Sequence, residues 1–100
     1  MEAQCIHLTF EVHGKVQGVF FRKFTVRKAT ELALRGWVMN APEKTKVVGE
    51  AQGPRPAIDA FKHWLRHEGS PKSRIERLVA RERPCEQFTF EDFQVRGGRD

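Results

Sequence analysis

The chain has 100 residues, of which 39% are hydrophobic and 31% charged, and its formal net charge is +5. This length and composition predict a single soluble globular domain, residues 1–100, with one core and little room for a deep cleft. No apolar run approaches the about 20 residues that cross a bilayer, and the first ten residues lack the basic start and apolar block of a signal peptide. We therefore expect a cytoplasmic protein with a shallow, loop-built site, and the positive charge favours anionic partners.

The two cysteines, Cys5 and Cys85, lie far apart in the sequence and show no spacing typical of metal ligands. We interpret them as free thiols in a reducing compartment.

Alternating and helical patterns divide the first half of the chain. Residues 6–13 (IHLTFEVH) alternate, with the apolar side chains on one face, which predicts a half-buried strand. Residues 21–34 predict a helix whose inward face carries Phe21, Thr25, Ala29 and Leu32. Residues 37–40 (WVMN) predict a short strand, and Pro42 marks the turn that follows it.

The second half of the sequence also predicts a strand followed by a helix, and then two further strands. Residues 46–53 (KVVGEAQG) alternate again, and a second helix begins near Pro54 and Pro56 and ends before Gly69. Residues 73–80 predict a fourth strand, and residues 88–96 (FTFEDFQVR) a last strand at a sheet edge. The order βαββαβ, with one extra strand, predicts an α+β sandwich of the ferredoxin-like class, with two helices on one face of a mostly antiparallel sheet.

The connection between the first strand and the first helix carries the clearest functional signal. It contains Gly14 and Gly18, and Arg22 follows in the first turn of the predicted helix. Glycines let consecutive N–H groups turn inward to hold an anion, and a helix N-terminus adds partial positive charge. The planar guanidinium of arginine fits a phosphoryl group. These residues indicate a phosphate site; the alternative is a tight strand–helix turn, with Arg22 reaching solvent or an acidic neighbour.

Longer segments resemble a known family. GKVQGVFFRKFT (14–25) is similar to the signature of acylphosphatases, and LRGWVMN, EAQGP, WLRHEGSPKSRIE and the final FQVR follow in the family's order at close to its spacing. The resemblance covers nearly the whole chain and is far more specific than any one of these segments.

This resemblance implies an enzyme that hydrolyses the carboxylic–phosphoric anhydride bond of acyl phosphates to a carboxylate and inorganic phosphate, without metal or cofactor. Arg22 matches the family's phosphoryl-binding arginine, and Asn40 matches the asparagine that positions the attacking water. The loop of Lys15, Val16, Gln17, Gly18, Val19 and Phe20 supplies backbone N–H donors. We also expect a monomer, a small-molecule acyl phosphate as substrate, inorganic phosphate as product and competitive inhibitor, and neither nucleic acid nor membrane as partner.

The chain departs from the family pattern near the site and at its end. Ala33 stands where glycine is common, Ala41 follows Asn40 where threonine is common, and the turn after Asn40 is one residue longer than usual. Gly97 and the residues after it continue beyond the usual end of the closing strand. These departures leave Arg22 and Asn40 in place.

Three other interpretations are weaker. An RNA-recognition domain has the same topology, but its aromatic motif is missing: the nearest match, RGWVMN, falls on the second strand. A carbamoyl-transfer role, as in larger hydrogenase maturation factors, requires a following domain. His63 and His67 have a metal-ligand spacing, but they lie opposite the apolar stripe of their helix with no acidic or cysteine partner nearby.

Overall fold

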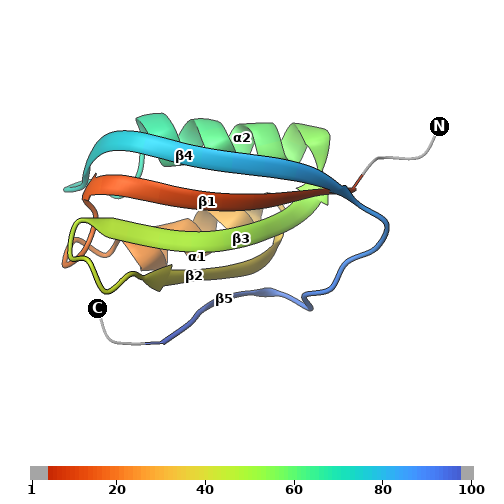
Figure 1. Ribbon diagram of the computed structural model, residues 1–100, viewed down its shortest axis with the longest axis horizontal. Coiled ribbons are helices and arrows are strands. Elements are labelled where there is room, and N and C mark those ends of the chain that lie inside the picture. Colours follow the sequence, from red (N-terminus) through yellow and green to blue (C-terminus); the bar gives the residue numbers. More distant parts are fainter. Residues whose placement is uncertain (1–4, 98–100) are drawn as a thin grey trace.

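The computed structural model describes residues 5–97. Its elements are β1 (Cys5–Lys15), α1 (Phe21–Glu31), β2 (Arg35–Asn40), β3 (Lys46–Pro54), α2 (Arg55–His67), β4 (Arg74–Cys85) and β5 (Phe93–Val95). The strands form one sheet in the order β4-β1-β3-β2-β5, and both helices lie on one side of it (Figure 1). The predicted α+β ferredoxin-like class is confirmed, and the sheet is mixed, because β5 runs parallel to β2 while all other pairs are antiparallel.

The first strand of the chain lies inside the sheet and forms the centre of the core. β1 pairs with β3 on one side and β4 on the other. The apolar residues of its alternating pattern, Ile6, Leu8, Phe10 and Val12, are all buried beneath the helices. The predicted alternation is therefore confirmed. Because β1 is paired on both sides, it fixes where the segments at its two ends begin.

The two helices pack on this core. The first helix, predicted for residues 21–34, ends at Glu31, so Leu32 of its predicted inward face follows the helix and is only half-buried. α2 buries Ile58, Phe61, Trp64 and Leu65, and α1 buries Phe21, Arg22, Thr25 and Ala29. α1 lies against β2 and β5, whereas α2 lies against β4, β1 and β3. Hydrogen bonds from Lys62 and Arg55 on α2 hold the pKa of Glu82 on β4 below its ordinary value, so the pairs tie α2 to the edge strand while Glu82 is ionised.

The last strand is shorter than predicted. Residues 88–96 were expected to be extended, but β5 spans only Phe93–Val95 at the edge beside β2. The buried Phe93 ring contacts Phe61 of α2, with ring centroids 5.8 Å apart. The residues before it form the connection from β4, which contacts His7 and Gln52 through Phe90 and Thr89 and joins β2 only at its end, where the Gly36 N–H donates to the Asp92 carbonyl.

The connection between β4 and β5 covers His7, which the alternating pattern of β1 places on the solvent-facing side of the sheet. His7 is only 5% exposed. The Gln52 amide donates to its Nδ1 over 2.9 Å, so its Nε2–H donates to Glu50 over 2.5 Å. Gln52 in turn bonds Thr89, which lies in the connection. The side of β1 that faces away from the helices is therefore covered at His7 and exposed to solvent at Thr9.

The interpretation of the cysteines as free thiols is wrong. Cys5 and Cys85 form a disulfide, with Cα atoms 5.0 Å apart. The two residues are directly opposite each other in the pairing of β1 with β4. The bond could not be predicted from the spacing of the cysteines, because they are 80 residues apart and only the pairing of β1 with β4 brings them together.

The end of α1 explains one departure from the family pattern. Ala33 has φ 58°, in the left-handed region. The N–H groups of Leu34 and Ala33 donate to the carbonyls of Ala29 and Thr30, a pairing that closes many helices and favours glycine at this position. Ala33 therefore holds a backbone conformation that is strained for any side chain with a Cβ.

We expect Ala33→Gly to raise the free energy of unfolding by about 0.5–1 kcal/mol, because the strain relieved exceeds the added freedom of the unfolded chain. Urea denaturation measures this value. Ala29→Gly, in the helix interior, is the matched control and should destabilise; a loss of stability from Ala33→Gly would contradict the analysis.

Replacing both cysteines, Cys5→Ser with Cys85→Ser, should lower the free energy of unfolding by about 2–5 kcal/mol, since the bond closes a long loop in the unfolded chain. Urea denaturation without reductant measures the change, and reduced wild-type protein should match the variant. Identical stability of oxidised wild type and variant would show that the bond is not formed in solution.

Candidate functional site

The residues that the sequence singled out gather at one end of the sheet. The β1–α1 loop, the β2–β3 turn and the α2–β4 connection all lie at the end on the left of Figure 1. Lys15 is the exposed last residue of β1, opposite Arg74 of β4. The loop that follows it reaches α1 at Phe21.

Two glycines and two buried valines shape this loop. Gly14 has φ 139° and lies at a register shift between β1 and β4, where a Cβ would collide with the carbonyl of Arg74. Gly18, at the exposed tip, has φ 75° and open space around it. Val16 and Val19 on either side are buried in the core. The valines therefore anchor the loop while Gly18 lets its backbone turn.

The backbone amides of the loop are not used by the sheet. Of the backbone hydrogen bonds outside helices and strands in residues 5–97, none has its N–H donor in residues 16–20. Phe20 caps α1 with a left-handed backbone (φ 58°) and a ring that is 59% exposed. No side chain caps the N-terminus of α1, and its first turn holds no acidic residue. This end of the helix thus keeps the partial positive charge that attracts anions.

Arg22 and Asn40 come from different elements. Arg22 lies in the first turn of α1 and is only 2% exposed, which is rare for a guanidinium and costly without compensating contacts. Asn40 is the half-buried last residue of β2 and stands opposite Val47 of β3. The strand order places the end of β2 at the same end of the molecule as the loop.

The side chain of Gln17 joins the loop to the turn after Asn40. Its Nε2 donates to the carbonyls of Ala41, Glu43 and Lys46, at 3.1, 2.9 and 2.9 Å. Sequence reasoning counted Gln17 only as a backbone donor, and no local pattern points to its partners, which lie more than 20 residues away. The carboxamide fixes the distance between the loop and the strand that carries Asn40.

The turn itself is held by short-range contacts. The Ala41 N–H donates to the Lys46 carbonyl over 3.1 Å. The Lys46 ammonium bonds the Glu43 carboxylate and holds the pKa of Glu43 below its ordinary value. The turn is thus folded back on itself, with Gln17 as its link to the loop.

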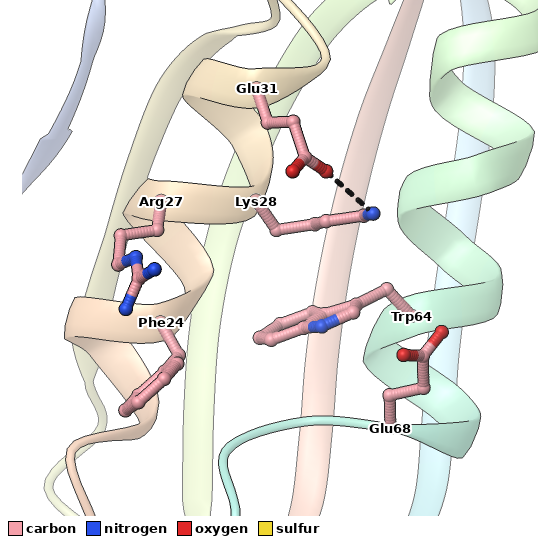
Figure 2. A pocket seen from close by; sticks show the side chains of 6 residues that line it. All are labelled: Phe24, Arg27, Lys28, Glu31, Trp64 and Glu68. Atoms are coloured by element: carbon pink, nitrogen blue, oxygen red, sulfur yellow. Dashed lines mark hydrogen bonds and ion pairs between the residues drawn. The ribbon is translucent and has the colours of Figure 1, made fainter.

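A separate groove lies between the two helices. Phe24, Arg27, Lys28, Glu31, Trp64 and Glu68 line it, with a volume of about 240 Å³ (Figure 2). The Lys28 ammonium reaches Glu31 at 2.7 Å. Two cations and two carboxylates balance one another, so this groove has no net charge to attract a phosphoryl group.

The two histidines of α2 lie side by side but belong to no larger group of metal-ligand side chains within residues 5–97. The rings of His63 and His67 lie 4.7 Å apart on the exposed side of the helix. Residues 5–97 contain no group of three or more histidine, cysteine, aspartate or glutamate side chains that could hold a metal ion. No helix within this range is long and apolar enough to cross a membrane.

Comparison with known proteins gives a consistent result. The family model named Acylphosphatase matches residues 8–95. Acylphosphatase-1 of Gallus gallus is 47% identical over 88 residues, which cover 87% of this chain and 88% of that protein. A solved acylphosphatase from Coxiella burnetii is 42% identical with a TM-score of 0.76, and covers 93% of this chain and 92% of its own. One from Bacillus subtilis is 29% identical with a TM-score of 0.83, and covers 92% and 99%.

Gln17→Ala should free the turn, because it removes the donor that holds three carbonyls. We expect faster hydrogen exchange in residues 41–46 and a loss of about 1–3 kcal/mol in the free energy of unfolding. Gln87→Ala, in the exposed connection before β5, is the control. Unchanged exchange in the turn would refute the linking role of Gln17.

Proposed function

The chain belongs to the acylphosphatase family and hydrolyses acyl phosphates, and we propose that Arg22 and the amides of residues 15–20 bind the phosphoryl group while Asn40 positions the attacking water. The observation that carries the proposal is the loop of residues 16–20, whose backbone amides are not taken by the sheet and which ends at the uncapped N-terminus of α1. The buried Arg22 lies in that first turn and supplies a full positive charge.

The chemistry needs little more than position and charge. Water attacks phosphorus in line, the bond between phosphorus and the acyl oxygen breaks, and its electron pair leaves with the carboxylate. The protons of the water end on the phosphate and in solvent. Because a carboxylic acid has a pKa of about 4, the leaving group departs as an anion without a proton donor.

Each proposed group has a task in this reaction. Backbone donors and a guanidinium stabilise charge on the phosphoryl oxygens as it shifts in the transition state. The Asn40 carboxamide orients the water, and Gln17 keeps the strand bearing Asn40 at a fixed distance from the loop. These roles account for hydrolysis without a metal, a cofactor or a paired general acid and base.

We further propose that the enzyme is a monomer and acts in the cytoplasm on small acyl phosphates. Sedimentation velocity tests the first statement and cell fractionation the second. The Cys5–Cys85 disulfide speaks against a reducing compartment, since such bonds are rare there.

Arg22→Ala should lower kcat/KM for benzoyl phosphate by about a hundredfold or more, with chelator present throughout, since loss of one transition-state donor costs about 10²–10³. Wild type should be inhibited competitively by inorganic phosphate and gain thermal stability from it. Both effects should weaken in the variant. Arg22→Lys keeps the charge without the planar fork and is expected to recover only part of the activity.

Circular dichroism must show that these variants are folded. A folded Arg22→Ala enzyme with wild-type kcat/KM would contradict the assigned role. Loss of wild-type activity in chelator would contradict metal independence.

Asn40→Ala should lower kcat by about tenfold to a thousandfold while the inhibition constant of phosphate stays near its wild-type value. The reason is that Asn40 is proposed to contact the water rather than the phosphoryl group. Steady-state kinetics with phosphate as inhibitor separates the two effects. A large rise in the inhibition constant at unchanged kcat would make Asn40 a binding residue instead.

A further inference from the structure

Four arginines of β4 stand on the open face of the sheet. The register places Arg74 opposite Lys15, Arg77 opposite His13, Arg81 opposite Thr9 and Arg83 opposite His7. Between them, Leu78 and Ala80 stand opposite Val12 and Phe10 and pack against the core. We call Arg74, Arg77, Arg81 and Arg83 the arginine row; all four are exposed, on the side of the sheet away from the helices.

The charge of this row is not neutralised locally. Within residues 5–97, no ion pair joins the row to a carboxylate. Two nearby acids serve other cations: Glu11 of β1 pairs with His13 and Lys46, and Glu82 is held on the helix side by Arg55 and Lys62. Glu76 lies between Arg74 and Arg77 in β4 and offers a single carboxylate beside the four arginines. Four guanidinium groups of one strand, with Val79 between Arg77 and Arg81, therefore face solvent.

The backbone beside the row is also unpaired on one side. β4 is the outermost strand next to β1, and among residues 5–97 no strand lies beyond it (Figure 1). Its 12 residues make a long edge, and an exposed edge can accept a further strand. A second copy of β4 paired at this edge would bring arginines against arginines, whereas a strand of acidic residues would bring carboxylates against them.

We propose that the β4 edge and the arginine row form a docking surface for an extended acidic polypeptide. Such a partner uses both features, with backbone hydrogen bonds along the edge and carboxylates on the row. A nucleic acid would use only the charge, because the aromatic rings of this face lie elsewhere and are engaged: the Arg96 guanidinium lies 4.7 Å from the Trp37 ring centroid and 5.9 Å from that of Phe90.

The test uses a dye-labelled glutamate oligomer of the length of β4 and a thymidine oligomer of equal charge, at low ionic strength where screening is weak. Fluorescence anisotropy should show that wild type binds the glutamate oligomer more tightly. Arg77→Glu with Arg81→Glu should weaken that binding by about tenfold or more. The matched control, Arg27→Glu with Arg66→Glu, changes the net charge equally on the helices and should have little effect.

Hydrogen exchange locates the peptide. The β4 amides that point away from β1 should become protected when the glutamate oligomer binds, and hydrolysis of benzoyl phosphate should be unchanged in both double variants. Three outcomes would overturn the proposal: equal weakening in both double variants, tighter binding of the thymidine oligomer, or binding without protection of β4.

Discussion

Pairing of β1 on both sides fixes the position at which the loop of the candidate site begins. The strand is held by β3 and β4 along its length, and its register with β4 shifts at Gly14, where any side chain would strike the backbone of Arg74. The β1–α1 loop, which we propose binds the phosphoryl group, therefore begins at a point that the sheet determines. Buried Val16 and Val19 then carry the chain into α1 with its backbone amides left outside the sheet.

The hydrophobic pattern was sufficient to predict the architecture, because each element has one apolar face. The errors occur where distant contacts outweigh the local pattern. Cys5 and Cys85 meet only through strand pairing, and His7 is buried only because Thr89 and Phe90 fold over that end of the sheet. β5 pairs with β2 over three positions only. None of these contacts has a trace in the neighbouring sequence.

Part of the candidate site was also predictable from the sequence. Glycine spacing and the following arginine indicated an anion site, and the longer resemblance supplied Asn40 and the reaction. The linking role of Gln17 was missed, since its carboxamide bonds carbonyls of the β2–β3 turn rather than a local group. Residues that bind through backbone atoms leave signals in glycine positions, whereas residues that hold two segments together leave none.

The place of β1 in the sheet has a consequence for synthesis of the protein. The strand made first lies between two partners made later, and β4 ends at Cys85, 80 positions after the residue it faces. Pairings this distant in the chain slow the search for the native topology. A nascent chain must carry this strand, with its buried apolar face, incompletely paired until β4 has emerged, so contact with chaperones is expected in that interval.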